Sequence, residues 1–371
     1  MRTSRLALVP FLLLSAGFST TQAGKLQART ELPTPWNFAV AGDSRNCGDV
    51  IMPAIAAGAA EDHAAFYWHL GDLRKISGRD QDFMQLAKLQ GNSPSIDEYR
   101  EQAWKDFQAN QLARFGSIPF FLGIGNHETV PPRTKAEFLT VFADLLNAPE
   151  IKRQRLKDDP KDDHIKTYYH WVRDGIDFIN LDNSTNSTFD EQQLKWFEDV
   201  VHRDSSDKSI HTLAVGMHEA LPESISEGHS MNESEEGTRS GRQVYNDLLK
   251  LQNASHKKVY VLASHSHYFM DGIFNTEYWR RHGGILPGWI IGTAGAERYP
   301  LPRDSDHAKA AQTNVYGYLL ATVNPAGESG NIKFEFREIS QDQIPPDVVQ
   351  RFTPSFVEDC FKDNRRTNDI F

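Results

Sequence analysis

The sequence predicts a layered α/β fold whose sheets are mixed rather than purely parallel. Short runs of apolar, β-branched and aromatic residues alternate with amphipathic stretches along the 371 residues, which is typical of strands connected by helices. Hydrophobic residues make up 39% of the chain and aromatic residues 11%, which excludes a disordered chain. The second half is richer in strand-like runs than the first, so we expect mixed sheets.

The individual elements follow from these runs. Strands are predicted at 36–42, 64–71, 118–125, 167–172, 177–182, 212–217, 258–264, 288–294, 316–323 and 332–339. Helices are predicted at 50–60, 95–114, 133–146, 189–203 and 240–253. Pro131 and Pro132 precede the third helix as a start signal, and Asp190 and Glu191 begin the fourth.

Two segments show little periodicity. Residues 222–242 are rich in Ser, Gly and Glu, so they predict either a mobile loop over a cleft or a plain surface segment. Residues 341–371 contain the turn-prone pair Pro345 and Pro346. We therefore expect one domain over 24–340, with 341–371 as a C-terminal tail packed on it.

The N-terminus has the pattern of a secretory signal peptide over residues 1–23. Arg2 and Arg5 precede an apolar run of about 13 residues, and a polar segment then ends at Ala23, where we expect cleavage. An uncleaved membrane anchor is the alternative, but the apolar run is too short to span a bilayer. The prediction is a secreted or periplasmic protein. In such an oxidising compartment Cys47 and Cys360 are able to pair, although their spacing alone does not decide whether they do.

Charge and composition exclude several classes of protein. The net charge is −10, from 40 basic and 50 acidic residues, and there is no basic stripe for an extended nucleic acid. The sequence contains no run of 18 apolar residues, so no membrane-spanning helix is predicted. The oligomeric state is left open.

Polar clusters follow five of the predicted strands, each at the strand's C-terminal end. They contain carboxylates, an amide and imidazoles, and they are Asp43-Ser44-Arg45, Asp72, Asn126-His127-Glu128, His218-Glu219 and His265-Ser266-His267. Loops from several strands converge at that edge of an α/β sheet, so we expect these side chains to form one site. Mixed oxygen and nitrogen donors favour Mn, Fe, Zn or Co over Ca or Mg. Histidines outside these clusters, among them His170 and His229, have no motif context and are expected to be structural.

The order of these clusters resembles the calcineurin-like metallophosphoesterase superfamily. The residues that carry the resemblance are Gly42-Asp43, Gly71-Asp72, Gly125-Asn126-His127-Glu128, His218 and His265-Ser266-His267, within roughly 36–295. The resemblance implies a four-layer α/β/β/α sandwich of two mixed sheets flanked by helices, with two divalent transition metal ions (Mn, Fe or Zn) at one edge. It also implies the ligands: Asp72 would bridge the ions, with Asn126, His218 and His265 completing one site and Asp43 and His267 serving the other.

Three further roles concern the surroundings of the ions. The resemblance implies that His127 protonates the leaving group or holds a phosphate oxygen. Glu128 is a candidate second-layer residue that orients an imidazole, and a plain turn residue is the alternative. Arg45 is a departure, because the family usually has a histidine there and a guanidinium has no lone pair for a metal. It either reaches the substrate phosphate as a catalytic residue or weakens the first site and leaves one ion, and Asn46 or water would then complete the ligands.

These expectations favour an exported phosphohydrolase that acts on small phosphate mono- or diesters through a water activated by two metals. A metal-binding module without turnover is the alternative from another class, and Arg45 is its best support. An exported nuclease would share the chemistry but is disfavoured by the acidic charge. Mono- and diester substrates are not distinguished by the metal ligands, because substrate choice depends on the surrounding loops.

Overall fold

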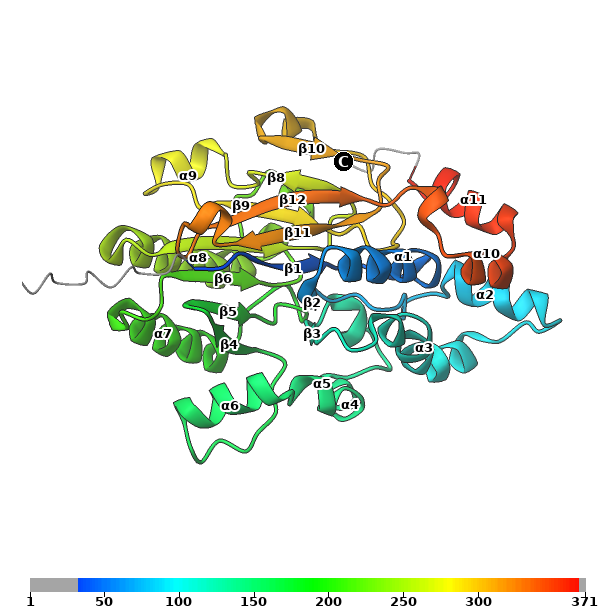
Figure 1. Cartoon of the computed structure of the whole chain (residues 1–371), viewed down its shortest axis with the longest axis horizontal. Helices are drawn as coiled ribbons and strands as arrows, with labels where there is room; N and C mark the ends of the chain where they lie inside the picture. The colour runs from blue at the N-terminus through cyan, green and yellow to red at the C-terminus, as the bar shows by residue number, and fades with distance from the viewer. Residues whose placement is uncertain (1–32, 367–371) are drawn as a thin grey trace, which may run out of the picture. The chain divides into compact units, whose positions relative to one another are not determined.

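The structure is a computed structural model that describes residues 33–366 (Figure 1). The predicted signal peptide and its cleavage site lie outside these residues. Within them the strands form two sheets. The smaller sheet has the order β12 (Ile332–Glu338), β11 (Gly317–Val323), β1 (Trp36–Ala41), β2 (Ala64–His69) and β3 (Phe120–Leu122). The larger sheet has the order β10 (Ala310–Gln312), β8 (Phe269–Asp271), β9 (Gly288–Ile291), β7 (Lys258–Ala263), β6 (Thr212–Gly216), β5 (Ile176–Asn180) and β4 (Tyr169–Arg173).

Both sheets are mixed, as predicted. The neighbours β1, β2 and β3 are parallel, and so are β5, β6, β7 and β9. Antiparallel strands are added at the flanks: β11 and β12 on one sheet, and β4, β8 and β10 on the other. The parallel strands β5 and β6 are buried along their whole length, which explains why their sequences do not alternate between apolar and polar residues.

Aromatic side chains fill the space between the two sheets. Phe38 of β1 packs edge-on against Phe178 of β5, with ring centroids 5.3 Å apart. Trp289 of β9 lies against Phe334 of β12 at 4.3 Å. Edge-to-face and offset contacts of this kind add to the free energy gained by burying the rings. They explain the high aromatic content near the predicted strand centres.

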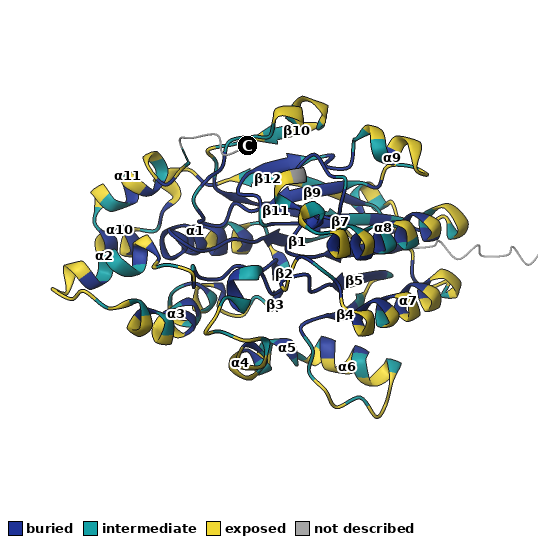
Figure 2. Cartoon of the chain, turned by 180° about the vertical axis from the view of Figure 1, so that it is seen from behind, coloured by how far each residue is buried: buried dark blue, intermediate teal, exposed yellow. Residues whose placement is uncertain are grey.

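Helices cover the outer faces of the two sheets. On the smaller sheet, α1 (Gly48–Glu61) contacts β2 and β11, and α3 (Ile96–Asn110) contacts α1. On the larger sheet, α8 (Glu235–Ser255) contacts β7, and α7 (Glu191–Ser206) contacts α8. Figure 2 shows that α3, α7 and α8 bury one face and expose the other, whereas α1 is buried on all sides over its first nine residues. The result is the expected four-layer α/β/β/α sandwich.

The remaining helices are shorter. They are α2 (Gln81–Leu89), α4 (Lys135–Val141), α5 (Ala143–Leu146), α6 (Pro149–Asp158), α9 (Glu277–Arg281), α10 (Pro346–Phe352) and α11 (Pro354–Lys362). The single helix predicted at 133–146 is two helices, α4 and α5. Its start is set by Thr134, whose side chain accepts a hydrogen bond from the backbone N–H of Glu137 at 3.2 Å, rather than by the two prolines.

The segment 222–242 is only partly a loop. Its last eight residues belong to α8, because Ser234 caps the helix by accepting the N–H of Gly237 at 2.9 Å. The start of α8 was not predicted, because Ser and Glu dominate the sequence there. Among the described residues no helix is long and apolar enough to cross a bilayer.

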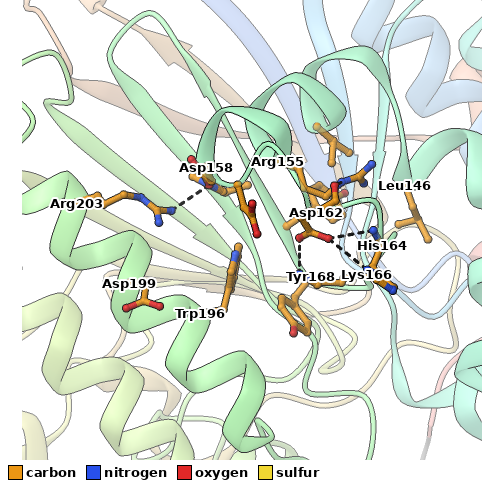
Figure 3. A pocket seen from close by; sticks show the side chains of 14 residues that line it. Leu146, Arg155, Asp158, Asp162, His164, Lys166, Tyr168, Trp196, Asp199 and Arg203 are labelled. Carbon is orange, nitrogen blue, oxygen red and sulfur yellow. Dashed lines mark hydrogen bonds and ion pairs between the residues drawn. The ribbon is translucent and has the colours of Figure 1, made fainter.

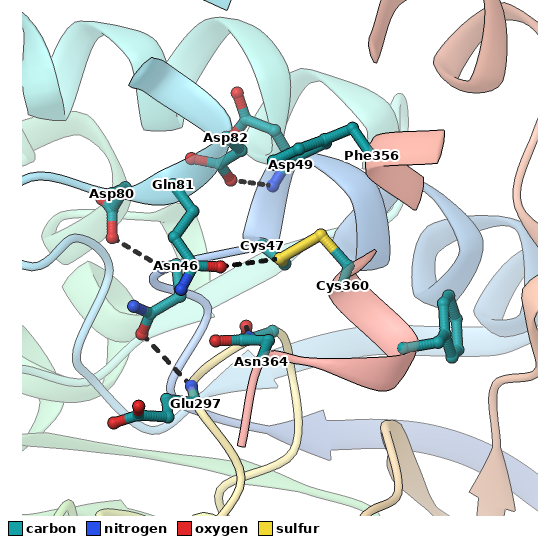
Figure 4. The surroundings of a disulfide bond; sticks show 12 residues. Asn46, Cys47, Asp49, Asp80, Gln81, Asp82, Glu297, Phe356, Cys360 and Asn364 are labelled. Carbon is teal, nitrogen blue, oxygen red and sulfur yellow. Dashed lines mark hydrogen bonds between the residues drawn. A yellow bond between two sulfur atoms is a disulfide. The ribbon is translucent and has the colours of Figure 1, made fainter. Parts of the chain in front are cut away.

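The C-terminal segment is helical and joined to the core. Phe352 of α10 and Val357 of α11 are buried in the same cluster as the strands of the smaller sheet. Cys360 of α11 forms a disulfide with Cys47 at the start of α1, with 6.0 Å between their Cα atoms (Figure 4). The bond that the sequence left undecided therefore links the first helix to the last, on the side of the molecule where the polar clusters lie.

Candidate metal centre

The predicted polar clusters meet where the parallel strands end. Asp43, Asp72 and Asn126 follow β1, β2 and β3, while His218 and His265 follow β6 and β7 of the other sheet. The two sheets thus contribute donors to a common edge, as the sequence predicted.

Backbone turns aim these side chains into the site. Asp43, Asp72 and His265 each have a positive φ, of 62°, 60° and 64°. This left-handed conformation is unfavourable for residues with a Cβ and is found mainly where a functional position requires it. Glycine allows close approach in the same turns: a Cβ on Gly125 would overlap the carboxylate of Asp72.

Four donor atoms surround one point, and we call them the four-ligand site: Asp72 Oδ1, Asn126 Oδ1, His218 Nε2 and His265 Nδ1. His218 Nε2 lies 3.0 Å from the Asn126 oxygen, 3.1 Å from the His265 nitrogen and 3.4 Å from the Asp72 oxygen. The other ring nitrogen of His218, Nδ1, donates to the carbonyl of Leu70 at 3.0 Å, and this contact assigns the lone pair to Nε2. Asp72 and His218 are buried and Asn126 and His265 are half-buried, and such a cluster of oxygen and nitrogen lone pairs fits a divalent transition metal ion.

The electrostatics of the site also favour a cation. Burial alone would lower the pKa of His218, but the charges of Asp72 and Asp43 outweigh it and raise that pKa. For His265, burial and the neighbouring His218 hold the pKa well below its usual value. The carboxylates of Asp72 and Asp43 therefore attract positive charge to the four-ligand site. Of the two imidazoles there, His218 accepts a proton readily and His265 does not. A metal ion meets that demand by binding the lone pairs of both rings.

Arg45 lies among the residues expected to hold the second ion, which we call the arginine site: Asp43, Asp72 and His267. The guanidinium Nη2 is 2.8 Å from His267 Nε2, and Nε is 3.3 Å from Asp72 Oδ2 and 4.0 Å from Asp43 Oδ1. Burial would raise the pKa of Asp43, yet His267, His218 and Arg45 hold it well below its usual value. As they stand, these three residues do not fit a metal ion, because a cation already lies between them. The predicted contact between Arg45 and substrate stays a prediction.

His127 lies at the rim of the same cluster. Its backbone N–H donates to Asp72 Oδ1 at 3.0 Å, and its ring Nε2 is 3.9 Å from Asp72 Oδ2. Burial lowers its pKa to about 4, with the nearby Asp72 carboxylate opposing this effect. The ring is therefore close enough to the predicted ligands to reach a phosphate held there.

Glu128 organises the backbone of the loops rather than an imidazole. Its buried carboxylate accepts N–H groups from Asp72 (2.8 Å), Leu73 (2.9 Å) and Gly125 (2.8 Å). Burial, together with the Asp72 charge, raises its pKa to about 8. Its described hydrogen bonds thus join the loop after β2 to the loop after β3, which carries Asn126.

The side-chain oxygen of Asn46, the suggested replacement ligand, already serves a backbone hydrogen bond. Its side-chain oxygen accepts the N–H of Glu297 at 3.2 Å, and its own N–H donates to Asp80 at 2.6 Å (Figure 4). These contacts fix the loop that leads into α1. The expectation that Asn46 supplies a ligand atom is not supported by this geometry.

Two residues beside the metal centre, Tyr299 and His229, belong to no sequence motif. Tyr299 packs against His267 with ring centroids 4.0 Å apart in a tilted arrangement. The ring centroid of His229 lies 5.5 Å from that of His265 and 5.2 Å from that of Tyr299, on which it stacks. Both rings line a cavity of about 310 Å³ that Tyr268 and Leu301 also line. His229 comes from the segment that the sequence analysis considered as a loop over a cleft. That was the only signal for it, because a lone histidine has no spacing to interpret.

Another cavity of about 310 Å³ lies elsewhere and shares no lining residue with the metal centre (Figure 3). Its walls include Tyr168 and Trp196, and several of its charged residues pair with one another. Arg203 donates to Asp158 at 3.0 Å, and Lys166 lies 2.7 Å from Asp162. The mutual pairing of these charges indicates a structural network.

Comparisons with known proteins agree with this geometry. The solved structure of purple acid phosphatase PPD1 from yellow lupin (Lupinus luteus) seeds is 14% identical, with a TM-score of 0.51, and the match covers 82% of this chain and 52% of that chain. For the structure of PhoD the identity is 14% and the TM-score 0.50, and the match covers 83% of this chain and 72% of that chain. These likenesses show a shared fold, and this chain spans about half the length of the lupin protein.

No curated protein sequence matches the chain significantly. A family model, however, described as calcineurin-like phosphoesterase, matches residues 37–269, which is more than half of the chain. The matched region includes each strand end that carries a donor to the metal centre. The chain therefore belongs to the calcineurin-like phosphoesterase family, a family of phosphate ester hydrolases.

Proposed function

We propose that this chain is an exported, metal-dependent hydrolase that cleaves phosphate mono- or diesters by attack of an activated water molecule. The observation that carries the proposal is the four-ligand site, in which Asp72, Asn126, His218 and His265 direct lone pairs at one point. A divalent ion bound there would supply positive charge next to the phosphate oxygens and lower the pKa of a water molecule. Two ions are the expectation from family resemblance, and the four-ligand site accounts for one.

The residues around the ion have separate tasks in this proposal. His127 holds a phosphate oxygen or protonates the leaving group, since its ring lies beside Asp72. Because burial lowers its pKa to about 4, the ring is neutral near pH 7, and it can protonate the leaving group only once a bound phosphate has raised that pKa. Arg45 adds a permanent positive charge that offsets negative charge developing on the phosphate. Glu128 keeps the two ligand-bearing loops in register.

The cavity beside the centre supports a substrate with a partly apolar alcohol portion. Tyr268, Tyr299 and Leu301 line it, and the ring of Tyr299 packs against His267. A phosphate at the metal would therefore place its ester group next to aromatic and aliphatic walls. We expect aryl phosphates to have a lower KM than short alkyl phosphates, and Leu301→Arg to raise the KM for aryl esters alone.

An activity assay tests the proposal. The purified chain is incubated with Mn²⁺ and either a chromogenic phosphomonoester or a chromogenic phosphodiester, in parallel with Asp72→Asn, His127→Ala and the exposed control Arg281→Ala. We expect turnover that Asp72→Asn reduces by about 10²-fold or more, as for loss of a group that stabilises transition-state charge, and that the control leaves unchanged. Metal binding without turnover on any ester would favour the binding module, and activity confined to nucleic acid would favour the nuclease.

Export is tested separately. We expect the chain to leave the cytoplasm of an expressing cell and to lose residues 1–23, so that the mass of the recovered protein corresponds to a start at Gly24. A protein that stays in the cytoplasm with an intact N-terminus would contradict this part of the proposal. The catalytic part does not depend on it.

A further inference from the structure

We propose that the Arg45 guanidinium takes the place of the second metal ion, so that the centre holds one divalent ion in the four-ligand site and an arginine cation in the arginine site. The inference rests on the proposed function for its site but concerns how many ions that site holds. Arg45 lies within ion-pair distance of Asp72 and Asp43 and within hydrogen-bond distance of His267. These are the same three residues that a second ion would need.

The hydrogen-bond pattern at His267 shows which atom serves the guanidinium. Its Nδ1 donates to the carbonyl of Glu297 at 2.5 Å, so the neutral ring has its lone pair on Nε2, which also lies 3.1 Å from Asp43 Oδ1. That lone pair faces Arg45 Nη2 at 2.8 Å.

A metal ion and the guanidinium compete for this position. An ion bound to His267 Nε2 would lie about 2.1 Å from that nitrogen, along the lone pair that now accepts from Arg45. The two cations would then be in direct contact in a buried place, where their repulsion is poorly screened. Arg45 is itself buried, with 7% of its surface exposed, so the side chain has little freedom to withdraw. The second ion is therefore excluded.

Hydrogen bonds fix the backbone of the loop after β1 that carries Arg45. The residue before it, Ser44, donates its backbone N–H to the carbonyl of Asp72 at 3.0 Å, and its hydroxyl lies 3.0 Å from His69 Nε2. Arg45 also precedes Asn46 and Cys47, which are tied to Glu297 and to the disulfide. The backbone on both sides of the guanidinium is thus fixed.

The four-ligand site is independent of this substitution. Its three ligands other than Asp72 make no described contact with Arg45, and Asp72 uses Oδ1 toward His218 while Oδ2 faces the guanidinium. Within the His265-Ser266-His267 motif, the first histidine therefore serves the metal and the second serves the arginine. This division can be tested with a matched pair of variants.

The test counts ions rather than turnover. The purified chain and its variants are equilibrated with Mn²⁺, bound manganese per chain is measured by elemental analysis, and the electron paramagnetic resonance spectrum distinguishes an isolated ion from a coupled pair. We expect one ion per chain with the spectrum of an isolated ion. Arg45→His should raise the count to two with a coupled spectrum, and Arg239→His, an exposed arginine on α8, should leave it at one.

The histidine pair provides a second readout. We expect His265→Ala to lose the ion and His267→Ala to retain one, so the inference remains testable if Arg45→His does not fold. Two ions in the unmodified chain, a single ion in a folded Arg45→His variant, or loss of the ion from His267→Ala would each overturn the inference. One ion without hydrolysis of any ester contradicts the proposed function alone, and a chain that binds no ion contradicts both.

Discussion

Replacing Glu128 by alanine tests how much of the site's geometry depends on one buried carboxylate. The side chain is fully buried and accepts backbone N–H groups from Asp72, Leu73 and Gly125 at 2.8 to 2.9 Å. Alanine would leave three buried donors without an acceptor, and each such donor costs about 1–3 kcal/mol. Because water entering the vacated space would recover part of this, we expect the free energy of unfolding to fall by about 3–6 kcal/mol.

The matched control is Glu128→Gln, which has nearly the same shape. One oxygen of Glu128 is shared by Asp72 and Gly125, and a glutamine oxygen in that position keeps both bonds and loses only the one from Leu73. We therefore expect Gln to cost about a third of what Ala costs, on the same scale of roughly 1–3 kcal/mol for each unsatisfied donor.

Urea unfolding of the metal-free chain, followed by circular dichroism, measures both changes. A second readout is Mn²⁺ affinity, which should fall in Glu128→Ala because the loops that carry Asp72 and Asn126 are no longer joined. The reasoning is refuted if Ala lowers the free energy of unfolding by less than about 1 kcal/mol, the smallest cost of even one unsatisfied buried donor. It is also refuted if Gln is as damaging as Ala.

Three further predictions concern other parts of the molecule. Cys360→Ser should lower the free energy of unfolding by about 2–5 kcal/mol, because the Cys47–Cys360 disulfide closes a very long loop. In urea unfolding, a reductant should bring the unmodified chain to the same free energy of unfolding as the variant. Equal stability of the variant and the oxidised chain would contradict this. Burial would lower the pKa of His170, but Asp177 and Asp158 raise it to about 10. Its contribution, on the order of a few kcal/mol, is therefore fully present below pH 6.5 and lost as the pH rises to about 10. Urea unfolding at several pH values should show this decline and His170→Gln should lack it, whereas a decline of the same size in the variant would assign it to other groups. Gly125→Ala should abolish Mn²⁺ binding in an equilibrium titration, because its Cβ would overlap the Asp72 carboxylate; unchanged affinity would show that the loop after β3 can move aside.

Most of the strands could be predicted because each one carries its own local signal. Runs such as 36–42 and 258–264 are long, apolar and β-branched, and the structure has β1 and β7 there. The short strands β8 and β10 were missed, because three residues are too few to show a period. Likewise α10 and α11 were expected only as a tail, since their burial depends on packing against the smaller sheet and on the disulfide.

The candidate site divides in a similar way. The residues of the four-ligand site could be predicted because each follows a strand that has its own pattern, and parallel strands bring their ends to one edge. His229 and Tyr299 could not, because they reach the site through loops whose path depends on the whole fold. The role of Glu128 was also hidden, since a carboxylate that accepts backbone N–H groups leaves no trace in residue spacing.

The sequence by itself determined the fold class, the family and the identity of the donor atoms, because these depend on local patterns and on chemical groups that do not change with conformation. Only the tertiary structure decided where Arg45 lies. The sequence showed that a guanidinium cannot bind a metal, but not where it lies. Its partner His267 is 222 residues away in the chain, and the two meet because separate sheets bring their strand ends to the same edge.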